Sequence, residues 1–484
     1  MANNYETTFT VNGFAGLAQD GNGFNTDLKY AFRGKNFDTT GGVLRSMEGY
    51  TALTGTLPAP IGTLAALYRR YPPKGATDAL VFVAAAGAKL YAREESAKTW
   101  TEIHAGLTSD SFDFVTYEVN EDSEGKPTDA PIDVLLLTNA KDGMLCVYGN
   151  DLSVKAVSIA PGGTASALKF NVMARHAERI WVTGNPDDPD KLMYSAPYNP
   201  FDWTANAEIP EDGAGDVLQP SWDGDSFVAL RPFGSQLLAF KKSRVWRILG
   251  TDPSTYIMKE QYGGGSIVEN TVTVSNDRVY MLGYGGLMVY DGVEVTRFYP
   301  QRIQHVISRI NYDHINKACA CMRGETFCLA LPLDTSTVNN AILEYNERER
   351  TFCLREGVSA KSFLAFADSV YFTSDETPGK MWEMTGGAML PMEWESAYQD
   401  MGAKNVQKSS FVVYLSANAA ITITVSIKTE RKDKTKTVTL TKDKVKAIRI
   451  SNAGRFWRLK LSTTSTTAWE LQGGLTVNME LDHD

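Results

Sequence analysis

The sequence predicts an all-β protein, a β-propeller of six to eight blades followed by a C-terminal antiparallel β-sandwich. Strand, turn and strand alternate along most of the chain, and candidate units recur at roughly 35 to 50 residues, a spacing typical of propeller blades. The 484 residues include 40 glycines, 21 tyrosines and 21 phenylalanines, as expected for tight turns between strands that favour aromatic residues. A repeated β unit places function in surfaces and assembly rather than in one deep pocket.

We divide the chain into three parts. Residues 1–56 form an N-terminal arm that ends in a strand entering a larger body, residues 57–390 form the propeller, and residues 391–484 form the β-sandwich. Asp20 to Asn25 are rich in turn formers, whereas Val43, Leu44 and Met47 suit a strand. Because the arm has too few alternating apolar positions for its own core, we expect it to lie along a neighbouring copy or across the propeller base.

Seven segments of the middle part each contain strands joined by a turn, such as the turn at Lys141 to Gly143. These candidate blades are residues 79–103, 131–159, 177–204, 235–261, 276–298, 325–357 and 367–384. One helix interrupts them. Ile303, Val306, Ile307 and Ile310 have helical spacing, so we expect a helix that packs at a junction between blades.

Beyond Pro391 the sequence alternates cleanly between apolar and polar residues, which predicts the separate β-sandwich. Five lysines flank one expected hairpin within it: Lys434, Lys436, Lys442, Lys444 and Lys446. They suit a solvated hairpin that protects a sheet edge, and they also suit docking onto an acidic partner surface. Both interpretations stay open.

Charge is unevenly divided along the chain. The net charge is −9, and the first 390 residues carry 34 basic against 47 acidic side chains, whereas the remaining residues carry 14 against 10. An acidic body does not bind nucleic acid by neutralising phosphates, because such binding requires lysine and arginine to release counterions. No apolar run is long enough to span a membrane.

No catalytic or cofactor-binding motif is present. The chain lacks the phosphate-binding, zinc-protease, serine-hydrolase and dinucleotide-binding patterns, and its five histidines are not spaced as a metal pair. We therefore expect no enzyme activity, no cofactor and no metal. The acidic segment Asn185 to Asp190 has oxygen ligands for Ca²⁺, but its two prolines suit a rigid loop. The five cysteines lack a CxxC pair and suit small buried strand residues.

Four marks occur in order from the arm through the fifth candidate blade and together span roughly half the chain. They are Asn36 followed by residues 41–50, then residues 179–203, 237–253 and 279–292. With these marks the chain resembles the tail hub or nozzle proteins of short-tailed bacteriophages, also called packaged-DNA stabilisation proteins. The last 90 or so residues match that family by architecture only.

The resemblance implies a virion structural protein of the phage tail, synthesised in the host cytoplasm. Six copies would form a homohexameric ring below the portal and its adaptor ring, in contact with other tail proteins such as a spike, fibre or needle. Double-stranded DNA would be held behind the ring and would cross it during ejection without sequence-specific binding. An acidic body suits this role, since like charge repels the phosphate backbone and lets it slide.

Candidate assembly contacts are exposed aromatic residues and the lysines already named. Tyr198, Phe201 and Trp203 lie in a loop bounded by prolines and suit an interface anchor, although packing within a blade is an equal alternative. A receptor- or glycan-binding propeller of a phage tail is the alternative function. An enzyme acting on polysaccharides would need two carboxylates facing across a cleft, and no segment indicates such a pair.

Overall fold

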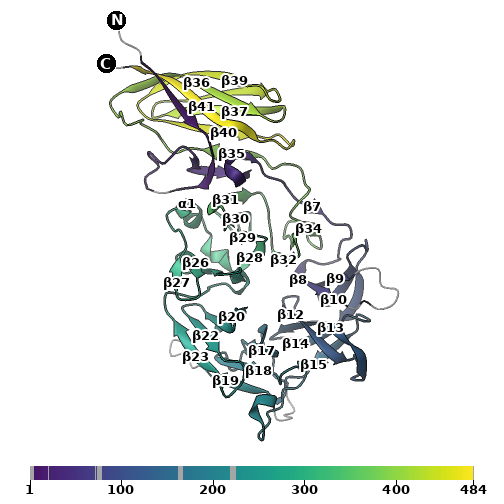
Figure 1. Ribbon diagram of the computed structural model, residues 1–484. Coiled ribbons are helices and arrows are strands. Elements are labelled where there is room, and N and C mark those ends of the chain that lie inside the picture. The colour runs from purple at the N-terminus through teal and green to yellow at the C-terminus, as the bar shows by residue number, and fades with distance from the viewer. Residues whose placement is uncertain are drawn as a thin grey trace.

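The computed structural model describes residues 5–19, 21–70, 72, 79–161, 167–218 and 225–482. Within them, seven four-stranded antiparallel sheets follow one another along the chain, and the predicted all-β propeller is confirmed (Figure 1). The first six blades are β8 to β11 (Ile61–Tyr68, Leu80–Ala86, Lys89–Glu94, Thr101–Ala105), β12 to β15 (Asp113–Glu121, Pro127–Asn139, Gly143–Tyr148, Val154–Val157), β16 to β19 (Val172–His176, Arg179–Thr183, Lys191–Tyr194, Gly215–Leu218), β20 to β23 (Phe227–Phe233, Gln236–Lys241, Val245–Leu249, Ile257–Gln261), β24 to β27 (Thr273–Val274, Val279–Gly283, Gly286–Tyr290, Val295–Arg297) and β28 to β31 (Cys319–Arg323, Thr326–Leu331, Ala341–Asn346, Thr351–Glu356).

The seventh blade closes the ring with a strand from the other end of the propeller sequence. It consists of β32 (Ser362–Phe366), β33 (Ser369–Thr373), β34 (Met381–Glu383) and β7 (Thr51–Ala52). The first strand of each blade contacts the first strand of the next, and β32 contacts β8. The arm thus supplies the outer strand of the last blade, and the circle is complete.

Blade strands are buried on both faces, which is why several read as continuous apolar runs rather than as alternating ones. All seven residues of β9 are buried. Its alternate residues belong to different hydrophobic clusters: Val81, Val83 and Ala85 pack toward the second blade, whereas Phe82 and Ala84 pack toward the seventh. Each blade therefore contributes to two inter-blade cores.

Two further antiparallel sheets, here called the two-sheet unit, form one end of the molecule, where both termini lie (Figure 1). One sheet has the order β1 (Tyr5–Val11), β41 (Leu471–Asp482), β36 (Gln407–Ala417), β39 (Lys446–Gly454), and the other the order β38 (Asp433–Leu440), β37 (Ile421–Thr429), β40 (Trp457–Thr463), β35 (Met392–Glu395), β4 (Arg33–Lys35). Burial alternates along β37, and buried residues of both sheets share one hydrophobic cluster. The arm supplies β1 and β4, so this unit is not built from residues 391–484 alone.

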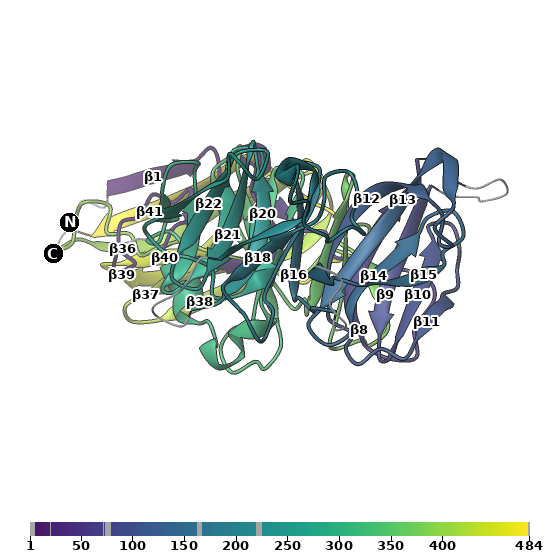
Figure 2. The same cartoon turned by 90° about the horizontal axis from the view of Figure 1, so that it is seen from below.

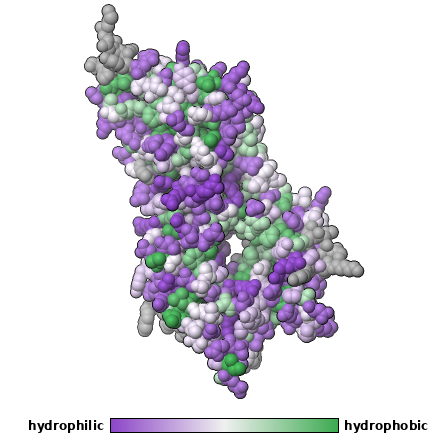
Figure 3. All heavy atoms as spheres, viewed as in Figure 1, coloured by the Kyte–Doolittle hydropathy of each residue, from purple (hydrophilic) through white to green (hydrophobic). Residues whose placement is uncertain are grey.

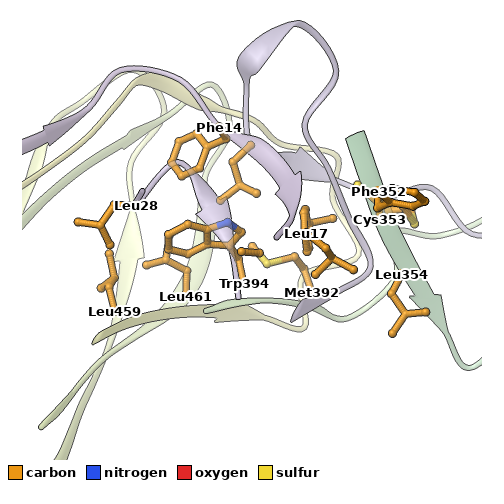
Figure 4. Packing of buried hydrophobic residues seen from close by; sticks show 14 of the residues in the cluster. Phe14, Leu17, Leu28, Phe352, Cys353, Leu354, Met392, Trp394, Leu459 and Leu461 are labelled. Atoms are coloured by element: carbon orange, nitrogen blue, oxygen red, sulfur yellow. The ribbon is translucent and has the colours of Figure 1, made fainter. Parts of the chain in front are cut away.

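The rest of the arm lies between the two-sheet unit and the sixth blade. It contains β2 (Ala15–Leu17), β3 (Tyr30–Ala31), β5 (Phe37–Asp38), the 3₁₀ turn η1 (Thr40–Gly42) and β6 (Arg45–Ser46). In Figure 4, Leu17 of the arm lies between Trp394 of β35 and Phe352 of β31, and Phe14 and Leu28 of the arm lie on the other sides of Trp394. The arm therefore packs across its own propeller and joins the two parts through a continuous core.

The predicted helix is shorter than its apolar spacing indicates. Helix α1 spans Gln304–Ser308 and is followed by the 3₁₀ segment η5 (Tyr312–Lys317). The side chain of Gln19 in the arm accepts hydrogen bonds from the backbone amides of His305 (2.9 Å) and Val306 (3.3 Å). Short 3₁₀ turns also occur at η3 (Pro210–Asp212) and η4 (Glu269–Thr271). No helix in the described part of the chain has the length and apolar character needed to cross a membrane.

Candidate functional site

The first strands of the blades surround a central cavity of about 830 Å³, which is lined by residues of six blades or of the segments just before them, and by Asn270 and Val272 next to the fifth blade. Figure 2 views the blades from below the molecule of Figure 1. Charged lining residues include Asp110, Asp113, Arg175, Arg231 and Lys361. The cavity is therefore polar and of mixed charge.

Asp113 and Arg231 tie neighbouring blades together across this cavity. The Asp113 carboxylate accepts hydrogen bonds from the backbone amides of Met173 in the third blade (2.9 Å) and of Phe114 (3.0 Å). Arg231 lies 4.0 Å from the same carboxylate and donates from Nε to the carbonyl of Val272, next to the fifth blade (3.2 Å). Asp113 and Arg231 thus link the second to the fifth blade.

Glu269 adds a second carboxyl group to this pair. Burial raises the pKa of Asp113, and Arg231 together with the two amides offsets part of that effect. Burial, reinforced by the charge of Asp113, raises the pKa of Glu269 to about 8, with Arg231 acting in the opposite direction. One guanidinium therefore serves two carboxyl groups, and Glu269 retains its proton near neutral pH.

A second cleft, of about 520 Å³, separates the sixth and seventh blades from the two-sheet unit. Glu344 accepts hydrogen bonds there from Arg355 (2.8 Å) and Arg323 (3.0 Å). Although burial opposes the charged form, the two guanidinium groups lower the pKa of Glu344. Arg355 also donates to the backbone carbonyl of Glu48 in the arm. The charges of this cleft are used to hold the arm against the sixth blade.

The three aromatic residues predicted as assembly contacts have different surroundings. Trp203 is only 3% exposed and donates from its indole to the carbonyl of Pro200 (3.1 Å). Phe201 is half-buried, stacks on Tyr148 at 6.4 Å between ring centroids and lies near the Lys155 ammonium. Tyr198 is 75% exposed. Of the three, Tyr198 alone presents most of its ring to a partner.

The five lysines are all exposed, but the expected hairpin is wrong. Lys434 and Lys436 lie on β38, Lys442 and Lys444 lie in the connection, and Lys446 begins β39. β38 pairs with β37, whereas β39 pairs with β36. The two strands are edges of different sheets, because residues that alternate cleanly can pair across either sheet, and the connection here crosses between them.

The acidic segment at Asn185 to Asp190 is a fixed loop. The side-chain oxygen of Asn185 accepts hydrogen bonds from the amides of Asp187 (2.8 Å) and Asp188 (3.2 Å), and Asp190 pairs with Lys241 at 2.7 Å. Among the residues that the structure describes, no group of three or more His, Cys, Asp or Glu side chains could hold a metal ion. All five cysteines are free and buried, which confirms their interpretation as core residues.

Sequence reasoning missed Asp113, Arg231 and Glu269. Asp113 and Arg231 lie on first strands of blades, and the candidate blades of the sequence analysis began at the second strand in most cases. The only feature of the sequence that could have indicated these three residues is that each charged side chain lies inside or beside a short strand. It did not stand out among 57 acidic residues.

No protein-family model and no curated protein matches the chain. Similar solved structures include the computationally designed Ika8 protein, with 8% identity, a TM-score of 0.37 and coverage of 69% of this chain and 99% of that chain. Another is the WD40 domain of Pan2 from Neurospora crassa, with 10% identity, a TM-score of 0.40 and coverage of 71% and 97%. At these identities the likeness concerns the fold alone. The chain is a β-propeller with an appended two-sheet unit.

Proposed function

We propose that the chain is a virion structural protein of a short-tailed phage, a tail hub or nozzle that forms a homohexameric ring below the portal and adaptor. The ring would close the channel around packaged DNA and pass the DNA during ejection. The observation that carries the proposal is the continuous core between the propeller and the two-sheet unit. This core joins the propeller and the two-sheet unit into one elongated subunit.

The first of the four sequence marks lies at this junction. The side-chain amide of Asn36 donates to the carbonyl of Pro391 (2.9 Å), and its oxygen accepts from the amide of Glu356 (2.8 Å). Residues 45–48 line the cleft between the propeller and the two-sheet unit. In a tail hub, a fixed angle between these parts would set the curvature of the ring.

The charge of the surface also suits this proposal. The first 390 residues carry an excess of 13 negative charges, which disfavours tight DNA binding and suits passage of DNA. Hydrophilic side chains dominate the face seen in Figure 3, and hydrophobic residues appear only in small groups. Contacts with the adaptor and with spike, fibre or needle proteins would then be mostly polar.

Native mass spectrometry and electron microscopy of the full chain, alone and with a portal and adaptor ring, test this proposal. We expect rings of six copies that bind the adaptor. A chain that stays monomeric at high concentration and never associates with the adaptor would contradict the proposal.

A receptor- or glycan-binding propeller is the second candidate. Tyr262 and Tyr284, which are 79% and 68% exposed at turns of the fourth and fifth blades, offer faces on which sugar rings can stack. Glycan-array binding by the monomer, abolished in Tyr262→Ala/Tyr284→Ala, would favour this function over the tail hub.

A further inference from the structure

We propose that copies of the chain meet head to tail, with the lysine edge of one copy seated on the acidic loop of the next. The lysine edge consists of Lys434, Lys436, Lys442, Lys444, Val445 and Lys446. The acidic loop is the connection between β18 and β19, residues 195–214. This inference rests on the proposed homo-oligomeric assembly and identifies the surfaces that build it.

The lysine edge is unsuited to pairing with another strand. β38 and β39 are edge strands of the two sheets, and lysines on edge strands oppose the addition of a further strand. Val445, which is 71% exposed among these lysines, has no such protective role, since it is apolar. A partner must therefore satisfy the edge through side chains, with carboxylates for the ammonium groups and an apolar contact for Val445.

The acidic loop offers both kinds of group. It contains Asp202, Glu208, Glu211 and Asp212 and neither lysine nor arginine. Glu208, Glu211 and Asp212 are exposed, and none of the ion pairs found among the described residues involves them. Tyr198 (75% exposed) and Ile209 (50% exposed) supply apolar surface in the same loop. Charge and apolar contact are thus complementary between the two surfaces.

A buried arginine fixes the loop in place. Arg179, which is 2% exposed, donates to the carbonyls of Ser195 (2.8 Å) and Gly213 (2.6 Å) at the two ends of the loop. It also donates to the carbonyl of Glu211. Because the loop is already ordered, its carboxylates lose little conformational freedom on binding.

The two surfaces lie at opposite ends of the molecule, the lysine edge in the two-sheet unit and the acidic loop at the tip of the third blade (Figure 1). When copies repeat this contact head to tail it is heterologous, and the growing assembly keeps one free lysine edge and one free acidic loop, at its two ends, until it closes into a ring. The same two surfaces also fit an antiparallel dimer, in which the contact occurs twice, so an assembly that stops at two copies would overturn the head-to-tail arrangement.

Zero-length cross-linking of the full chain tests the contact directly. A carbodiimide activates a carboxyl group, which a neighbouring lysine amine then attacks to form an amide. An equal mixture of unlabelled and ¹⁵N-labelled chain distinguishes links between copies from links within one. We expect mixed-isotope links that join Lys442, Lys444 or Lys446 to Glu208, Glu211 or Asp212.

Charge reversal provides the second arm of the test. We expect K442E/K444E/K446E and E208K/E211K/D212K each to weaken self-association at least tenfold in sedimentation velocity, and an equal mixture of the two variants to restore it. K98E/K126E/K242E, which reverses three exposed lysines of the propeller, is the matched control and should associate normally. If each of the two charge-reversal variants forms rings normally on its own, the proposed contact is overturned and the proposed function is unaffected. Absence of any self-association of the natural chain, with or without the adaptor, would overturn both.

Discussion

At the scale of single residues, the charge state of Glu269 couples the stability of the protein to pH. Its pKa is raised to about 8 by burial and by Asp113, whereas an unfolded chain has a glutamate pKa of about 4.3. At a pH below the pKa of the unfolded state, Glu269 is protonated in both the folded and the unfolded chain, and its contribution to the free energy of unfolding is fully present. As the pH rises toward 8, the unfolded state gains by ionising and the folded state does not, so stability falls.

We expect the free energy of unfolding to decrease by on the order of 4 kcal/mol between pH 5 and pH 9 because of this group. Glu269→Gln should remove most of that slope and stabilise the protein at pH 9 relative to the natural chain. Urea titrations at both pH values measure it. Glu294→Gln, at an exposed turn of the fifth blade, is the control. A slope unchanged in Glu269→Gln would show that Glu269 is ionised in the folded protein at neutral pH.

At the scale of elements, Gly16 determines how closely β2 approaches β31. A Cβ atom at Gly16 would lie 2.1 Å from the carbonyl oxygen of Phe352, whereas one at Gly13 would lie 3.6 Å from its nearest neighbour. The carbonyl belongs to a blade strand and cannot move without disturbing the sheet. We expect Gly16→Ala to destabilise the protein by about 2 to 4 kcal/mol and Gly13→Ala by much less, measured by chemical denaturation. Equal stabilities of the two variants would contradict the close approach.

The closure of the seventh blade depends on a strand of two residues. β7 pairs Ala52 with Trp382, and the amide of Leu53 donates to the carbonyl of Met381 at 2.9 Å. Leu53→Pro removes that donor, whereas Leu53→Ala retains it. We expect the proline variant to unfold at a temperature about 1 to 3 °C lower than the alanine variant, since roughly 1 to 3 kcal/mol is lost with the hydrogen bond and a chain of this length has a large unfolding entropy. Similar unfolding temperatures would mean that β7 contributes little to closure.

Elements of the fold differ in how visible they are in the sequence. In four of the seven blades the second and third strands are joined by tight turns, so residues such as Gly143 and Gly87 made them predictable. The first strands follow longer connections. One of them, β24, has only two residues, which is too short for an alternation of apolar and polar residues to be recognised. Pairing of β7 with β34 and of β1 with β41 joins residues more than 300 positions apart, and local pattern contains no information on such partners. Asp113 and Glu269, the carboxyl groups at the central cavity, were missed for the same reason, because their partner Arg231 lies far from Asp113 in the sequence.

At the scale of the whole molecule, Trp394 connects the propeller to the two-sheet unit. It is fully buried, and its ring meets Phe14 edge to face at 5.5 Å between centroids. We expect one cooperative calorimetric transition for the described parts together, and Trp394→Ala should lower the free energy of unfolding by about 3 to 5 kcal/mol. Trp100→Ala, a partly buried site on the first blade, should cost less. Two transitions, of which Trp394→Ala shifts only one, would show that the parts unfold independently.

The pairing of β7 with β34 also orders events during translation. β7 leaves the ribosome before the first blade is made, yet its partner strand is complete only once synthesis has passed Glu383. Until then the seventh blade lacks its outer strand, although each earlier blade can form as it emerges. A premature stop before that point therefore releases an open arc of blades, in which the apolar faces of the first and last blades are exposed. Chaperones have to cover these two faces until the ring of blades can close.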